Sequence, residues 1–283
     1  MNTVGLISKP AVPAAAEVVP KLLAWLESRG IHVRYDEHAA FYAARTGGLM
    51  RQEVPEGCDL VIVLGGDGTL LSAARAIGNR QIPLFAVNLG SLGFLTAITI
   101  DDLYPELERA LRGEHRIGRR KLLHAEVHRG GAVVSHYEAL NDVVLTKAAI
   151  ARIIDLDTYV DRQFVCAYKA DGLIVSTPTG STAYSLSAGG PIIFPSVPAI
   201  CLTPICPHML TYRPVLVSES SEVEVRCRGD ASVYLTIDGQ IGEPLEREDS
   251  VVCRSSQYAL HLIRPPRMMF FDVLRQKLKW GER

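Results

Sequence analysis

The spacing of hydrophobic residues changes near residue 116 of this chain. Before that point, short continuous apolar runs alternate with stretches in which apolar residues recur every three or four positions. The run Leu60–Leu64 is rich in β-branched residues and predicts a buried parallel strand, and residues 70–77 predict a helix packed on it. The same alternation gives further strands at 3–7, 31–35 and 83–88 and further helices at 14–29, 38–44 and 101–111. Strands that alternate with helices predict a doubly wound parallel α/β domain over residues 1–115.

Beyond residue 116, apolar and polar residues alternate with a period of two. Leu123, Ala125 and Val127, for example, are separated by polar residues. The same alternation returns at 154–161, 222–227, 233–237 and 258–262. Such strands, with little helical pattern between them, predict an antiparallel β-rich, sandwich-like domain over residues 116–265.

Two helices are expected in this second part of the chain. One begins near Ser181. The other is amphipathic and covers 271–279, with Phe271, Leu274 and Leu278 on one side, after Pro265-Pro266 has ended the last strand. We expect this last segment, 266–283, to pack back on the α/β domain.

Composition and charge narrow the class of protein. The 283 residues are 48% hydrophobic and 22% charged, which is typical of a globular protein. The net charge of −1 gives no electrostatic reason to expect nucleic acid or a membrane surface as partner. No apolar run reaches the ~18 residues of a membrane-spanning helix, and the first ten residues resemble a strand more than a signal peptide, so a cytoplasmic protein is expected. The six cysteines are expected to be buried free thiols: Cys58, Cys166, Cys201, Cys206, Cys227 and Cys253.

A glycine-rich turn joins the strand Leu60–Leu64 to the helix that follows. Its glycines allow close approach of a ligand, and a helix N-terminus offers N–H groups suited to phosphate. Asp67 therefore places an anion where an anion would bind. That placement makes sense if the carboxylate takes a proton from a hydroxyl or holds a metal. The alternative is a tight turn in which Asp67 only caps the helix.

A second glycine-containing stretch, 171–191, is rich in hydroxyl groups. It carries six Ser or Thr residues between Thr177 and Ser187, besides Tyr184. An ordinary helix cap needs one hydroxyl. Six hydroxyls beside an aromatic ring, where a helix begins, favour a nucleotide site. The usual P-loop, the dinucleotide fingerprint GxGxxG, the protein-kinase motifs and a nucleophile elbow are all absent from the sequence.

Together these segments resemble the ATP- or polyphosphate-dependent NAD kinases, over roughly residues 60–245. The turn Gly65–Thr69 alone is less specific, because lipid kinases and phosphofructokinases have similar turns. Its combination with TPTGSTAYSLSAGGP at 177–191 is highly specific. The remaining matching segments are Asn88–Gly90, Leu92–Leu95, Leu140–Leu145, Ala170–Gly172, Pro204–His208 and Arg213-Pro214.

The resemblance implies transfer of the terminal phosphoryl group of ATP, or of polyphosphate, to the 2′-hydroxyl of the adenosine ribose of NAD, which gives NADP. It implies that Asp67 accepts the hydroxyl proton. Mg²⁺ or another divalent cation is implied by the charge of the triphosphate, although no dedicated metal-binding residues are visible. Residues implied on the phosphate-donor side are Gly65, Gly66, Gly68 and Thr69.

The resemblance also implies a set of NAD-binding residues. Asp142 stands where the family often has Glu, which keeps the charge but shortens the reach. The implied residues are Gly68, Phe94, Asn141, Asp142, Arg152, Lys169, Asp171, Thr182, Ala183, Tyr184, Ser187 and Gln240. Several also have a purely structural alternative: a turn for Asn141, Asp142, Asp171 and Gln240, a core position for Phe94, and a solvated side chain for Arg152 and Lys169. A homodimer or homotetramer, formed through the β-rich domain and with sites between domains, is implied as well.

Two other functions stay open at this point. A lipid kinase of diacylglycerol or sphingosine type would share the glycine turn, but it would need a lipid-facing groove or basic surface. A non-catalytic nucleotide sensor would not need Asp67. The sequence does not choose between ATP and polyphosphate, or between NAD and NADH.

Overall fold

The computed structural model describes residues 1–148, 153–229, 231–264 and 269–280. The chain forms two compact units. Unit 1 consists of Met1–Arg119 and Leu260–Arg283, and unit 2 of Arg120–Ala259. The boundary between the units falls inside two long strands, β5 (Arg116–Arg129) and β16 (Ser250–Arg264).

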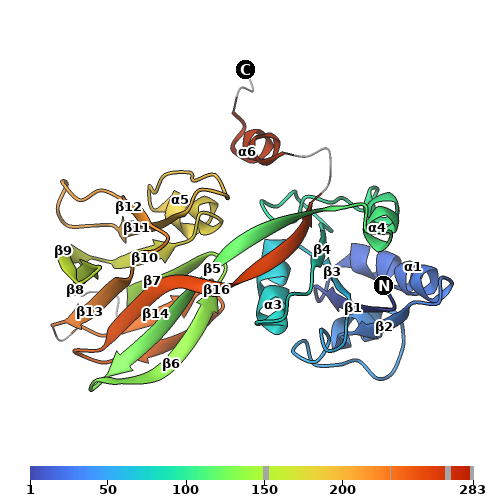
Figure 1. Cartoon of the computed structure of the whole chain (residues 1–283), viewed down its shortest axis with the longest axis horizontal. Helices are drawn as coiled ribbons and strands as arrows, with labels where there is room; N and C mark the ends of the chain where they lie inside the picture. The colour runs from blue at the N-terminus through green and yellow to red at the C-terminus, as the bar shows by residue number, and fades with distance from the viewer. Residues whose placement is uncertain (149–152, 230, 265–268, 281–283) are drawn as a thin grey trace. The chain divides into compact units, whose positions relative to one another are not determined.

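Unit 1 is built on a parallel sheet (Figure 1). Its strands are β1 (Thr3–Ser8), β2 (His32–Tyr35), β3 (Leu60–Leu64) and β4 (Leu84–Val87). Its helices are α1 (Pro13–Glu27), α2 (Glu37–Tyr42), α3 (Asp67–Ile77), α4 (Leu103–Leu111) and α6 (Phe270–Leu278). The strand order is β2-β1-β3-β4, and Leu262 near the end of β16 pairs in parallel with Leu84 of β4. This confirms the predicted parallel α/β architecture.

Helices cover both faces of this sheet. On one face, α1 and α4 contribute Leu22, Leu26 and Leu107 to a core that includes Ile62 and Phe85. On the other face, α3 contacts β3 and β1 (Figure 1). Every residue of β3 is buried, which explains its continuous apolar run.

Unit 2 contains two groups of strands with the core between them. One is an antiparallel sheet in the order β12-β11-β10-β7-β14-β15. Its strands are β7 (Asp142–Lys147), β10 (Gly172–Ser176), β11 (Ala199–Ile205), β12 (Val215–Ser218), β14 (Val233–Ile237) and β15 (Ile241–Leu245). The other group contains β5, β16, β6 (Ala132–Ala139), β13 (Val223–Arg228), β8 (Ile154–Val160) and β9 (Gln163–Ala170). Its strand order is β16-β13-β8-β9, and β5 pairs with both β16 and β6.

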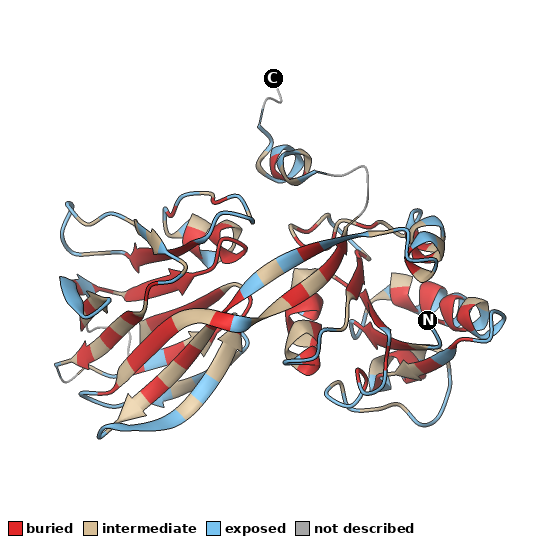
Figure 2. Ribbon diagram, viewed as in Figure 1, coloured by how far each residue is buried: buried red, intermediate tan, exposed pale blue. Residues whose placement is uncertain are grey.

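Alternate residues of these strands point into one shared core. Leu145 and Leu202 enter it from the first sheet, and Leu156 and Val225 enter it from the second group. In β8 and β13, buried and half-buried positions accordingly alternate along the strand (Figure 2). The structure therefore confirms the antiparallel, sandwich-like interpretation of the period-two pattern.

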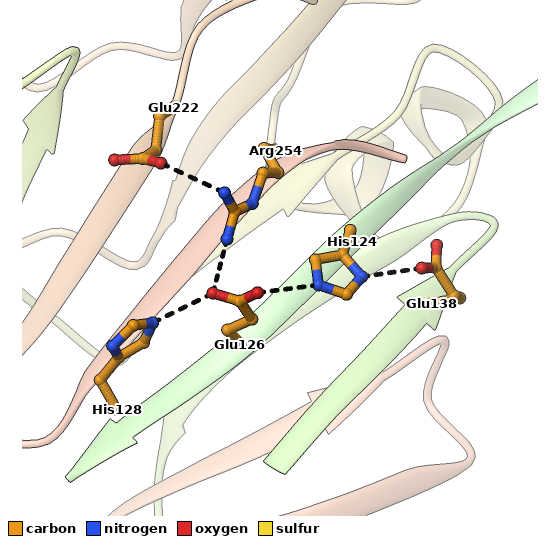
Figure 3. Close-up of polar contacts among 6 residues, drawn as sticks. All are labelled: His124, Glu126, His128, Glu138, Glu222 and Arg254. Atoms are coloured by element: carbon orange, nitrogen blue, oxygen red, sulfur yellow. Dashed lines mark hydrogen bonds and ion pairs between the residues drawn. The ribbon is translucent and has the colours of Figure 1, made fainter. Parts of the chain in front are cut away.

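The outward face of β5 carries a polar network (Figure 3). Glu126 is contacted by His124 at 3.1 Å and by His128 at 3.2 Å, and Arg254 of β16 donates to it at 2.5 Å. His124 also contacts Glu138 of β6 at 2.8 Å. Burial raises the pKa of Glu126, but the hydrogen bonds from both histidines and the charge of Arg254 outweigh burial, so its pKa lies below the usual value.

Three local expectations are corrected. The helix expected near Ser181 is a 3₁₀ turn at Gly180–Thr182 followed by the four-residue helix α5 (Tyr184–Ser187). In α6, Val273 and Leu274 are buried, whereas Phe271 is exposed. Only four of the six cysteines are buried, because Cys166 is half-buried and Cys206 is exposed. Pro265 and Pro266 lie outside the described residues.

Candidate active site

The glycine turn of unit 1 links β3 to α3 and leaves no room for a side chain at Gly65. A Cβ atom at Gly65 would lie 2.4 Å from Oγ1 of Thr69, so glycine is required there. Gly66 is the N-cap residue and has no side chain to cap the helix. Gly65 and Thr69 are buried, Gly66 is half-buried, and Gly68 is exposed. Of the four residues predicted to face the phosphate donor, the exposed Gly68 and half-buried Gly66 are open to a ligand.

Asp67 is the first residue of α3, and its carboxylate binds a different loop. Oδ2 accepts a hydrogen bond from the backbone N–H of Phe94 at 2.9 Å. Oδ1 accepts hydrogen bonds from the N–H of Leu95, the N–H of Thr96 and the hydroxyl of Thr96, each at 3.1 Å. The idea that Asp67 only caps its own helix is therefore wrong, because these bonds fix the loop that follows β4.

This loop is held from inside by Asn88, a buried residue. The Asn88 amide donates to the carbonyl of Ser91 at 2.7 Å and to Oγ1 of Thr96 at 3.0 Å, and its oxygen accepts from the N–H of Gly90 at 2.7 Å. Phe94 at the loop tip is half-buried, and Nζ of Lys277 in α6 lies 5.7 Å from the centre of its ring.

Unit 2 contains a cavity of about 400 Å³, within the range of small-molecule sites. Four predicted residues line it together: Asn141, Asp142, Ala183 and Tyr184. Asp142 is buried, whereas Tyr184 is 43% exposed and offers an aromatic face. The other lining residues are Val144, Thr146, Thr236, Asp238 and Gly239.

Asp238 was missed by the sequence interpretation, although it lies two positions before the predicted Gln240. Its carboxylate accepts hydrogen bonds from three consecutive N–H groups, those of Leu140 at 3.0 Å, Asn141 at 2.7 Å and Asp142 at 3.1 Å. Burial raises the pKa of Asp142 to about 7, and the charge of Asp238 adds to the effect. The only local signal was an Asp-Gly pair at a hairpin turn.

The opposite side of the Asn141 segment is held by Thr177. Its hydroxyl donates to the carbonyl of Leu140 at 2.6 Å and accepts from the N–H of Gly180 at 3.0 Å. A Cβ atom at Gly180 would lie 2.0 Å from the carbonyl oxygen of Asn141, so this contact requires glycine. The segments around Asp238 and Thr177, both distant in sequence from Asn141, thus hold this wall of the cavity in place.

Further hydroxyls of the second glycine loop also fold the loop itself. Ser181 donates to the carbonyl of Pro178 at 2.7 Å and accepts from the N–H of Ile193 at 2.9 Å. Ser185 shares a 2.8 Å hydrogen bond with Thr203 of β11. The bonds between the Ser181 hydroxyl and the backbone compete with the hydrogen bonds of a regular helix, which explains why α5 begins only at Tyr184. Thr177, Ser181 and Ser185 are therefore structural, contrary to the expectation that the hydroxyls line a helix N-terminus.

Five other predicted residues do not line this cavity. Thr182 donates to the carbonyl of Thr179, Lys169 is exposed and 3.8 Å from Asp155, and Asp171 accepts a 2.6 Å hydrogen bond from Lys147. Ser187 and Gln240 are exposed. Lys147, the partner of Asp171, was another residue that the sequence interpretation missed. Arg152 lies outside the described residues.

In the described ranges, no group of three or more His, Cys, Asp and Glu side chains is arranged to hold a metal ion. Among helices within those ranges, none is long and apolar enough to cross a membrane.

Solved structures share this two-unit architecture. A crystal structure of yeast NADH kinase complexed with NADH aligns with a TM-score of 0.92 and 26% identity, covering 100% of this chain and 89% of the yeast chain. An NAD kinase from Archaeoglobus fulgidus in complex with ATP aligns with a TM-score of 0.77 over 96% of this chain and 98% of the other, at 24% identity, and therefore supports the fold alone. The fold is thus that of kinases that phosphorylate nicotinamide dinucleotides.

Sequence comparison defines the family. The ATP-NAD kinase N-terminal domain matches residues 4–115, and the ATP-NAD kinase C-terminal domain matches residues 140–265. The NAD kinase of Solibacter usitatus is 72% identical over 100% of this chain and 99% of its own length. The NAD kinase of Geobacter sulfurreducens is 49% identical over 100% of both chains. The chain belongs to the ATP-NAD kinase family and is a phosphotransferase.

Proposed function

We propose that this protein transfers the terminal phosphoryl group of ATP, or of polyphosphate, to the 2′-hydroxyl of the adenosine ribose of NAD and so makes NADP. The observation that carries the proposal is the Asp67 carboxylate at the glycine-lined start of α3. A carboxylate is negatively charged and does not bind phosphate. Next to backbone N–H groups that can bind phosphate, it is suited to accept the proton of the hydroxyl group that is phosphorylated.

Asp67 acts as the general base in this proposal. Phosphoryl transfer depends mainly on positioning and charge stabilisation, and an Asp that receives the hydroxyl proton is a recurring part of it. The half-exposed carboxylate is held by the loop after β4, so it has a defined position before substrate binds.

The phosphate donor is assigned to the turn Gly65, Gly66, Gly68 and Thr69. The N-terminus of α3 offers N–H groups and the positive end of a helix dipole, which favour phosphate. Mg²⁺ or another divalent cation is proposed to enter as part of the nucleotide substrate, because a triphosphate needs its charge neutralised for transfer.

NAD is assigned to unit 2. Asn141, Asp142, Ala183 and Tyr184 line one cavity, which offers polar groups for a ribose and an aromatic face for a base. We extend the assignment to the remaining residues that the family resemblance implies. These are Gly68, Phe94, Arg152, Lys169, Asp171, Thr182, Ser187 and Gln240. NADH is a second candidate acceptor, since the yeast relative was crystallised with it.

The organisation of the protein is proposed on the same grounds. Residues 1–115 carry the chemistry, 116–265 bind NAD and form a homodimer or homotetramer, and 266–283 pack on the α/β part. The contact of Lys277 with Phe94 supports the last point. We propose a cytoplasmic location, where NAD and ATP are available.

The test measures NADP formation from NAD, ATP and Mg²⁺, with polyphosphate and NADH in parallel reactions. Asp67→Asn keeps the shape of the side chain but removes the base. It is expected to lower kcat by roughly 10²-fold or more while NAD binding, followed by calorimetry, largely persists. Near-normal turnover of Asp67→Asn, or phosphorylation of a diacylglycerol or sphingosine in place of NAD, would overturn the proposal.

A further inference from the structure

The two oxygens of the Asp67 carboxylate have unequal surroundings. Oδ1 accepts three hydrogen bonds, from the N–H of Leu95 and from both the N–H and the hydroxyl of Thr96. Oδ2 accepts one, from the N–H of Phe94 at 2.9 Å. Since a carboxylate oxygen has two lone pairs, Oδ1 is fully used and Oδ2 keeps one acceptor position.

The direction of the Thr96 hydroxyl is fixed by its neighbour Asn88. The Asn88 oxygen accepts from the N–H of Gly90, so its nitrogen must be the atom that faces Thr96, at 3.0 Å. That nitrogen can only donate. The hydroxyl of Thr96 therefore accepts from Asn88 and sends its own proton to Oδ1 of Asp67, at 3.1 Å.

This arrangement is tightly packed. Thr96 is fully buried, and Asn88 is only 6% exposed. A Cβ atom at Gly93 would lie 2.2 Å from Oδ1 of Asp67 and 2.4 Å from Oγ1 of Thr96. The side chains of Asn88, Thr96 and Asp67 therefore have little freedom to rearrange, and Oδ1 has no space for a substrate.

We propose that Thr96, oriented by Asn88, is a positioning residue that presents Oδ2 of Asp67 as the atom that takes the proton. The inference rests on the proposed function. As the ribose oxygen forms its bond to the terminal phosphorus, its O–H bond breaks and the proton passes to Oδ2. The bond between the phosphorus and the bridging oxygen breaks, and its electron pair leaves with the nucleoside diphosphate.

The test is Thr96→Val, which keeps the shape of the side chain but removes the hydroxyl. We expect kcat to fall roughly tenfold, the effect of losing one hydrogen bond to a charged group, while KM for NAD changes little. Thr96→Ser restores the hydroxyl and is expected to recover most of the loss. Thr99→Val is the matched control, because its hydroxyl bonds Asp102 instead, at 2.8 Å.

A second variant covers the case in which Thr96→Val folds poorly. Gly93→Ala leaves Thr96 intact but forces Oδ1 to move, so it is expected to lower kcat more than it changes KM. All rates are divided by the fraction of molecules that bind NAD, measured by calorimetry, so that partial unfolding does not imitate the effect.

The outcomes separate this inference from the proposed function. If Asp67→Asn is inactive and Thr96→Val and Gly93→Ala keep normal kcat, Asp67 is the base but Thr96 does not position it. An equal loss in Thr96→Val and Thr96→Ser would also overturn the inference, since the hydroxyl would then be irrelevant. Near-normal turnover of Asp67→Asn would instead overturn the proposed function in which Asp67 is the base.

Discussion

The carboxyl group of Asp142 lies in surroundings that favour its neutral form. It is 4% exposed, and the charged Asp238 lies beside it. Three backbone N–H groups donate to the Asp238 carboxylate and hold it in this position. The Asp238 carboxylate thus holds the wall of the cavity, while the Asp142 carboxyl group is available to a ligand.

This pair makes stability depend on pH. The ordinary pKa of Asp142 is 3.8 and its folded pKa is about 7. Below pH 3.8 the Asp142 carboxyl is protonated in both the folded and the unfolded protein. Between pH 3.8 and about 7 it ionises in the unfolded protein but stays mostly protonated in the folded one. Asp142 therefore lowers the free energy of unfolding progressively as the pH rises from 3.8 to about 7. Asp142→Asn should therefore raise the free energy of unfolding more at pH 8 than at pH 5, and weaken NAD binding. Urea unfolding checks this, and a difference that does not vary with pH would contradict it.

At the scale of single residues, the sequence singled out some of the residues that line the cavity but not the residues that support them. Asn141, Asp142 and Tyr184 were all expected in one site, and they line one cavity. Asp238 and Thr177 hold that cavity by hydrogen bonds to Leu140 and its neighbours. Such bonds join residues distant in sequence and leave no periodic trace, so pattern reasoning could not find them.

At the scale of elements, the spacing of hydrophobic residues correctly distinguished strands buried on both faces from strands buried on one face. Strand β3 is apolar throughout because both its faces are covered, and β13 alternates because one face meets the core. The hydroxyl-rich loop at 177–187 was misinterpreted as the start of a regular helix. Its hydroxyls instead replace helical hydrogen bonds with bonds to backbone that is distant in the chain.

The outward face of β5 yields a prediction about its polar network. The folded pKa of Glu126 is lowered from 4.5, so its ionised form stabilises the fold fully above pH 4.5 and loses this effect as pH falls through the folded pKa. Glu126→Gln should cost about 1 kcal/mol of unfolding free energy at pH 7, and the difference should shrink below pH 4.5. Denaturant titrations at pH 7 and pH 3.5 measure the free energy of unfolding of both proteins.

The control for this experiment is Glu17→Gln, which alters an exposed glutamate on α1. It should leave the free energy of unfolding unchanged at both pH values. A loss in Glu126→Gln that is as large at pH 3.5 as at pH 7 would show that packing, and not charge, sets the contribution of Glu126.

At the scale of the whole molecule, unit 1 is assembled from both ends of the chain. Its sheet contains residues near the end of β16, and α6 belongs to the same unit. The sequence predicted that the last segment would pack on the α/β part through Phe271, Leu274 and Leu278. Leu274 is buried and Leu278 half-buried, but Phe271 is exposed. Phe271 was placed on the packed side because helical spacing alone does not show where the helix docks.

Leu274 and Phe271 provide a matched pair for this packing. Leu274 is 1% exposed, so Leu274→Ala should cost about 2–3 kcal/mol and lower the Tm by roughly 5–10 °C. Phe271 is 54% exposed, and Phe271→Ala should lower the Tm by less than a third as much. Thermal melts followed by circular dichroism compare the variants, and equal shifts would show that α6 packs through another face.

The three hydrogen bonds to Asp238 also bear on the order of events during protein synthesis. The acceptor is made 97 residues after Asn141, which at cellular rates of translation is a delay of roughly 5–20 s. Until Asp238 leaves the ribosome, the N–H groups of 140–142 have no carboxylate to bind. A nascent chain should therefore acquire its ability to bind dinucleotide late and abruptly, after the β14–β15 hairpin has emerged.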